Sequence, residues 1–183
     1  MKTLLSAMLL SVTFFSVFSQ NDSLKTKGTF YKLSLATTLA VNSDYGEYGH
    51  DDETLLIPNA LFVNNTIGYQ FDKRSLIGLN LEYNWHSEQG LHFLPAYLSF
   101  QYNIIVFEKS DKIFIRGGYG TLLGLGKSFE KGNLYKFGIG SQSIPFRNND
   151  SLLFGLDFTR KRFGHRTLEG LSSVSIFVEY MFF

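Results

Sequence analysis

The chain of 183 residues has no cysteine, only three prolines and no surplus of either charge. Without cysteine it has no disulfide scaffold, no cysteine-ligated metal site and no attachment atom for a bacterial lipoprotein anchor. Its formal charge is +1, and Lys2 lies in the first nineteen residues, so the remainder is neutral and offers no basic field for nucleic acid. After residue 19 no apolar run approaches the roughly 18 residues of a membrane-spanning helix. Yet 44% of the residues are hydrophobic, so this apolar content must lie in short segments.

The first nineteen residues have the pattern of a secretory signal peptide. A basic start at Lys2 precedes an apolar stretch, and Val17-Phe18-Ser19 precedes Gln20. We expect cleavage after Ser19 and export from the cytoplasm.

Beyond residue 27 the hydrophobic pattern has a period of two, which predicts β-strands. Turn-forming residues divide it into eight segments, each with one apolar and one polar face. The expected strands are 28–40, 58–71, 75–86, 92–105, 112–125, 133–145, 151–163 and 171–183. We therefore predict an all-β fold, an eight-stranded antiparallel up-and-down barrel over residues 28–183.

Two features indicate that the apolar face of this barrel points outward, into a membrane. The polar face is rich in glycine, as a narrow lumen containing a few long polar side chains requires. Aromatic residues gather near both ends of the apolar stripes, like the two interfacial girdles of a transmembrane barrel. The predicted girdle residues are Tyr31, Tyr69, Phe71, Tyr102, Tyr180 and Phe182 at one rim, and Tyr83, Trp85, Tyr135 and Phe158 towards the other. The alternative is a soluble, lipocalin-like ligand-binding barrel, whose apolar face points inward.

The export signal, the eight strands and the ending Val174-Ser-Ile-Phe-Val-Glu-Tyr-Met-Phe-Phe183 resemble a small Gram-negative outer-membrane β-barrel of the OmpX and OmpA-barrel class. The resemblance implies an outer-membrane location and a short periplasmic segment at residues 20–27. It also implies insertion by the barrel assembly machinery, with the last strand as the signal. The alternation places Phe182 on the lipid face, with Glu179 and Met181 inward. Phe183 is then either a frayed extra residue or the sign of a bulge.

Charged residues of both signs fall on the predicted lumen face, which indicates a filled polar core. The predicted ion network consists of Lys32, Glu82, Arg116, Lys136, Asp157, Lys161 and Glu179. Unpaired charges in such an interior cost several kcal/mol, so we expect these groups to pair. Lys32 and Glu179 lie at similar depths on the first and last strands, which predicts an ion pair across the closing seam. Pro95 has no amide hydrogen for a closed barrel, so it must mark a bulge or a strand start.

The sequence gives little sign of a metal or catalytic site. Its four histidines all fall near the predicted outer rim, without a clear cluster, and we expect no metal and no cofactor. Some outer-membrane barrels of eight strands are lipid A deacylases with a His-x-Ser pair and a carboxylate. Here His165, Thr167 and Glu169 occupy the matching strand end, but a threonine replaces the serine. This enzymatic reading is kept as an alternative.

The preferred hypothesis is a non-enzymatic outer-membrane protein that serves surface interaction or is a small subunit of an envelope complex. Its expected partners are outer-membrane lipid and lipopolysaccharide, and one further envelope protein. Lipopolysaccharide phosphates suit the basic residues near the seventh strand's outer end, which are Arg160, Arg162 and Arg166.

Overall fold

The computed structural model describes residues 27–41, 56–87, 90–107, 111–125, 129–143, 150–165 and 168–183. The expected signal peptide (1–19) and residues 20–26 of the expected periplasmic segment lie outside this part. In the described residues, no helix is both long and apolar enough to cross a membrane. The strands are β1 (Gly28–Val41), β2 (Leu56–Gln70), β3 (Ser75–His86), β4 (Leu91–Phe93), β5 (Pro95–Val106), β6 (Lys112–Leu122), β7 (Gly132–Ser143), β8 (Ser151–His165) and β9 (Leu168–Phe182).

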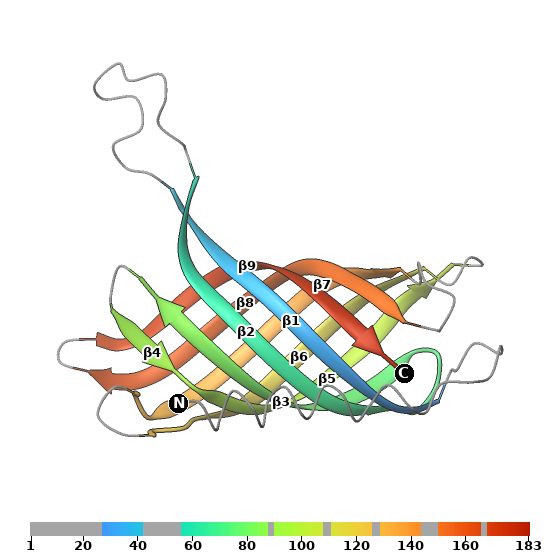
Figure 1. Ribbon diagram of the computed structural model, residues 1–183, viewed down its shortest axis with the longest axis horizontal. Coiled ribbons are helices and arrows are strands. Elements are labelled where there is room, and N and C mark those ends of the chain that lie inside the picture. Colours follow the sequence, from blue (N-terminus) through green and yellow to red (C-terminus); the bar gives the residue numbers. More distant parts are fainter. Residues whose placement is uncertain are drawn as a thin grey trace, which may run out of the picture.

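The strands form one closed antiparallel sheet, a barrel in which successive strands pair, except that β4 and β5 both pair with β3 (Figure 1). Closure occurs between the first and last strands. Tyr31 lies opposite Phe182, and the register continues unbroken to Thr38 opposite Ser175. Both described chain ends therefore lie at one end of the barrel, which we call the termini end. The opposite end, which carries the connections from β1 to β2 and from β8 to β9, is the loop end.

Pro95 interrupts one strand of the barrel without changing its register. Both β4 and β5 pair with β3, with Asn84 opposite Phe93 and Leu81 opposite Ala96, so the two segments follow one alignment. The backbone carbonyl of Leu94 accepts a hydrogen bond from the Leu123 amide, on the β6 side. Pro95 therefore faces β3, where its missing N–H breaks the ladder. A new strand does start at Pro95, with no bulge, and the two halves count as one of eight strands.

The outer face of the barrel is apolar and the inner face carries the charges. Leu79, Leu81 and Phe154 are 61%, 48% and 53% exposed, whereas Glu82 and Asp157 are 1% exposed. This polarity is the reverse of the lipocalin-like alternative, in which apolar side chains point inward. The predicted orientation of both faces is confirmed.

The connected ends of β1 and β2 rise away from the rest of the barrel wall (Figure 1). The register between β1 and β2 shifts between Thr38 and Leu39, directly after the last β1–β9 pair. The Thr37 hydroxyl donates to the carbonyl of Ala60 at 2.9 Å beside this shift. A bulge of this kind bends its strand, and here it coincides with the departure of the hairpin from the wall.

At the termini end, the turn between β2 and β3 is fixed by one carboxylate. Asp72 Oδ1 accepts hydrogen bonds from the backbone amides of Arg74 and Ser75 at 2.6 and 2.7 Å. These bonds stabilise the charged form and lower the pKa of Asp72 below its ordinary value. This is the local turn chemistry that aspartate favours in short connections.

The last strand ends at Phe182, which is 39% exposed, while Glu179 and Met181 are buried. Since the register against β1 has no break, no bulge is present. Phe183 is beyond the strand but is not frayed. It packs on the apolar cluster at this end, with its ring 6.2 Å from that of Phe30.

Candidate functional site

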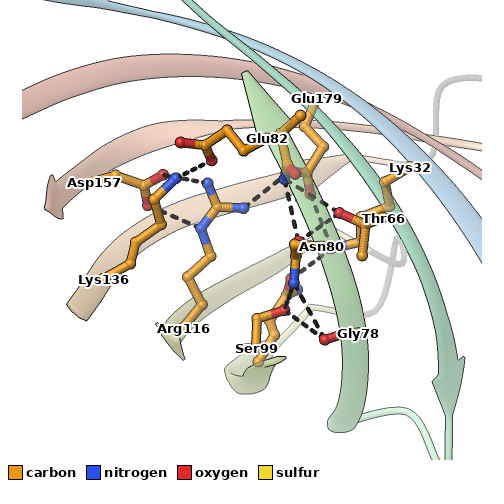
Figure 2. A network of polar contacts seen from close by, with 12 residues as sticks. Lys32, Thr66, Gly78, Asn80, Glu82, Ser99, Arg116, Lys136, Asp157 and Glu179 are labelled. Atoms are coloured by element: carbon orange, nitrogen blue, oxygen red, sulfur yellow. Dashed lines mark hydrogen bonds and ion pairs between the residues drawn. The ribbon is translucent and has the colours of Figure 1, made fainter. Parts of the chain in front are cut away.

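The middle of the lumen contains a network of three cations and three carboxylates (Figure 2). Lys32 Nζ lies 2.9 Å from Glu179 Oε1, which is the ion pair predicted across the seam. Arg116 joins this pair to the next carboxylate, because its Nη1 lies 3.0 Å from Glu179 Oε2 and its Nη2 lies 2.7 Å from Asp157 Oδ2. The Arg116–Asp157 contact is bidentate, with a second bond from Nε at 2.9 Å, the geometry that arginine provides best.

The network continues through Lys136 to the other side of the lumen. Lys136 Nζ is 3.6 Å from Asp157 Oδ2 and 2.5 Å from Glu82 Oε2. Glu82 also accepts bonds from the Tyr97 hydroxyl at 2.8 Å and from Asn84 Nδ2 at 2.6 Å. The six charged residues come from six different strands, so the network joins strands that are not neighbours in the wall.

Glycine makes the room that these long side chains need. Gly138 lies beside Asp157 in the β7–β8 pair, and a Cβ atom there would overlap Asp157 Oδ1 and press on the Arg116 side chain. Gly118 similarly lies against the ring of Tyr97. The sequence prediction that lumen glycines leave space for a few long polar chains is consistent with these two contacts.

Apolar side chains fill the lumen on both sides of the network. The sequence had predicted a lumen that is polar throughout, and the structure does not show this. The termini cluster contains Phe30, Leu76, Phe114, Leu153, Phe177 and Met181 among its buried members. The loop cluster contains Leu91, Phe93, Tyr97, Leu122, Leu134 and Phe163. The prediction failed here because near the strand ends apolar residues occupy both faces, as in Leu152-Leu153-Phe154, and alternation alone does not mark the inward one.

Lys161 is in the lumen but is not part of the ion network, contrary to expectation. Its side chain is fully buried and its Nζ lies 3.0 Å from His86 Nε2. The ammonium lies 4.5 Å from the ring centre of Phe62 and 5.1 Å from that of Phe93. Among the described residues no carboxylate lies within ion-pair distance of Lys161, and Glu82 is bound by Lys136. Lys161 is thus held by a histidine and by aromatic faces, contacts that its place in the sequence did not predict.

The lumen has almost no free space beside the network. A cavity of about 20 Å³ lies among residues that include Lys32, Asn80 and Glu179. This is room for about one water molecule, which needs roughly 10–15 Å³. At this level the lumen is filled by side chains.

The ten predicted girdle aromatics all lie on the outer face and none is buried. At the termini end, the rings of Tyr180 and Phe182 lie 4.6 Å apart, and the Tyr180 hydroxyl donates to Asp150. Towards the loop end, the rings of Tyr119 and Tyr135 lie 5.1 Å apart. The predicted girdle did not include Tyr119, although this residue lies on the apolar face of the fifth expected strand, as the girdle residues do on theirs.

Of the three basic residues expected at the loop end, the structure describes Arg160 and Arg162. Arg162 is exposed and its guanidinium lies 5.9 Å from the Tyr135 ring centre. Arg160 Nη1 donates to the Ser172 hydroxyl at 2.9 Å. Arg166 lies outside the described residues.

The residues of the enzymatic alternative fall outside the described part of the chain. This applies to Thr167 entirely and to the side chains of His165 and Glu169. Within the described residues no three histidine, aspartate or glutamate side chains form a group that could hold a metal ion. Of the other histidines, His86 points into the lumen and His92 lies beside Tyr83, with 2.8 Å between Nδ1 and the hydroxyl.

No family model matches this chain, and no curated protein matches it. Among solved structures it is similar to the N-terminal β-barrel domain of Pseudomonas aeruginosa OprF, with a TM-score of 0.48 and 10% sequence identity, over 86% of this chain and 100% of that domain. The architecture that the coordinates give is a closed antiparallel barrel of eight strands.

Proposed function

We propose that this protein is a non-enzymatic integral outer-membrane β-barrel with a sealed lumen. It acts through its outer surface and its loop end, in surface interaction or as a small subunit of an envelope complex. The observation that carries this proposal is the polarity of the wall. Large apolar side chains cover the outside, and the charged groups lie inside a closed ladder that leaves no open sheet edge along the barrel. Such an apolar outer surface is stable in the hydrocarbon of a membrane, whereas in water a patch of this size favours aggregation.

The sealed lumen argues against a channel. Ions crossing it would have to displace Arg116 from two carboxylates and then pass an apolar cluster at either end. Breaking a buried ion pair costs about 3–5 kcal/mol. The network instead makes the barrel a rigid support for what its surface displays.

Lipopolysaccharide is the partner that the loop end suits best. Arg160 and Arg162 lie at outward positions just beyond the apolar belt of β8, whose outward side chains Phe154, Leu156 and Phe158 are exposed. Guanidinium groups at this level favour the phosphates of an outer-leaflet glycolipid.

Membrane fractionation with a heat-modifiable gel assay tests this proposal. We expect the protein in the outer-membrane fraction, with faster migration when the sample is not boiled, because a folded barrel stays compact. In planar bilayers we expect no stable single-channel conductance. Recovery of the folded protein in an aqueous extract without detergent would refute the membrane assignment, and a steady conductance would refute the sealed lumen.

A further inference from the structure

Asn65 is a polar residue in the middle of the apolar outer surface. Between its outward neighbours Val63 and Ile67 on β2, it lies opposite Leu33 on β1 and Leu81 on β3. Leu33 and Leu81 are 45% and 48% exposed. Along β2 this amide lies between the girdle residue Tyr69 and Leu61, which is opposite the girdle residue Trp85.

The hydrogen bonding of Asn65 is only half complete. The Tyr31 hydroxyl donates to Asn65 Oδ1 at 2.5 Å, which satisfies one lone pair of the carbonyl. Within the described residues, Asn65 Nδ2 has no acceptor, and the side chain is partly exposed on the outer face. An unpaired amide in hydrocarbon costs several kcal/mol. The side chain therefore needs a partner from outside the barrel.

We propose that Asn65 marks a contact between two copies of this chain, an inference that rests on the membrane location proposed above. A two-fold axis along the membrane normal brings identical residues together at the same depth. An asparagine amide is self-complementary, since it carries donors and an acceptor. Nδ2 of each copy donates to Oδ1 of the other, which still has a free lone pair beside the bond from Tyr31.

The surface around Asn65 fits a second copy better than a charged partner. Leu33, Val63, Ile67 and Leu81 surround it with apolar contacts, and no charged side chain of a described residue lies among these register neighbours. Opposite Leu81, β5 has the small residue Ala96. Small side chains at a membrane interface allow two backbones to approach closely.

Cysteine cross-linking tests the contact directly, because the chain has no cysteine of its own. Asn65→Cys is compared with Ile139→Cys, an outward and 50% exposed residue of β7, on the wall across the barrel from β2. After oxidation in isolated outer membranes, we expect a covalent homodimer from Asn65→Cys at several times the yield from Ile139→Cys. Equal yields from the two variants, or a cross-link from position 65 to a different protein, would overturn the inference.

A second variant measures the amide itself. Asn65→Leu removes the polar group without adding charge, and we expect a roughly tenfold weaker self-association in mild detergent, measured by analytical ultracentrifugation. An unchanged or tighter dimer refutes the role of the amide. Heat-modifiable migration of each variant shows that the barrel has folded. A monomeric protein that still fractionates with the outer membrane contradicts this inference alone, whereas an aqueous protein contradicts the proposed function.

Discussion

Two buried lysines of the lumen should respond differently to the same substitution. Lys136 and Lys161 are 8% and 0% exposed, so both ammonium groups have lost most of their hydration. Lys136 contacts two carboxylates, Glu82 and Asp157, whereas Lys161 contacts His86 and two aromatic rings. Methionine has a similar length and no charge, and so replaces either side chain with little change in packing.

Lys136→Met leaves Glu82 and Asp157 short of one cation in a closed interior. Removing one partner of a buried ion pair costs about 3–5 kcal/mol, and we expect this loss in the free energy of unfolding. Lys161→Met removes an ion that has no carboxylate in direct contact. Cation–π contacts contribute about 2 kcal/mol when desolvated, against a burial penalty of several kcal/mol per ion. We therefore expect Lys161→Met to be neutral, or more stable by about 1–4 kcal/mol.

The assay is equilibrium urea unfolding of the barrel from lipid vesicles. Trp85, the one tryptophan of the chain, is 44% exposed on the outer face and reports the loss of its lipid surroundings through its fluorescence. If Lys136→Met proves as stable as the original chain, or Lys161→Met loses as much as Lys136→Met, the reasoning from ion pairing is wrong.

Three further outcomes are expected. Gly138→Ala lowers the free energy of unfolding in urea by about 1–3 kcal/mol because its Cβ overlaps Asp157, whereas Gly117→Ala, which meets only open space, changes this free energy by less than about 0.5 kcal/mol; equal effects would contradict the packed lumen. The Asp72 carboxyl titrates below its ordinary pKa of 3.8, so its hold on the turn is complete above that pH and is lost as the pH falls through the lowered pKa; a midpoint at or above 3.8 in carboxyl-carbon NMR contradicts this. Mass spectra of lipid A are the same with and without the protein, and an acyl change that His165→Ala abolishes would establish an enzyme instead.

The sequence was sufficient to predict the fold and the direction of each face. Alternation with a period of two over eight segments leaves few architectures, and the glycines on the polar face indicate which side is crowded. The Lys32–Glu179 pair followed from strand position alone, because first and last strands of a closed barrel must be neighbours. These predictions depend on local pattern and on closure.

Other features could not be predicted because they depend on which side chains meet across the lumen. Tyr97 donates to Glu82, yet it lies just after Pro95 in a stretch where the alternation is hard to follow. The phenylalanines of the two apolar clusters had no distinct signal, since an inward phenylalanine differs from an outward one only in parity. Lys161 had the right parity, but parity does not show which side chain it meets across the lumen, and there it contacts His86 instead of a carboxylate.

Pro95 gives the wall a defined weak point. The register places Pro95 opposite Glu82 on β3. Because proline has no amide hydrogen, one backbone hydrogen bond between the two strands is missing there. At the same level the Glu82 side chain binds Lys136 across the lumen. Beyond that level, β3 and β4 pair through three residues each, Asn84–His86 with Leu91–Phe93. Local opening of the barrel should therefore begin at this end of β3 and β4.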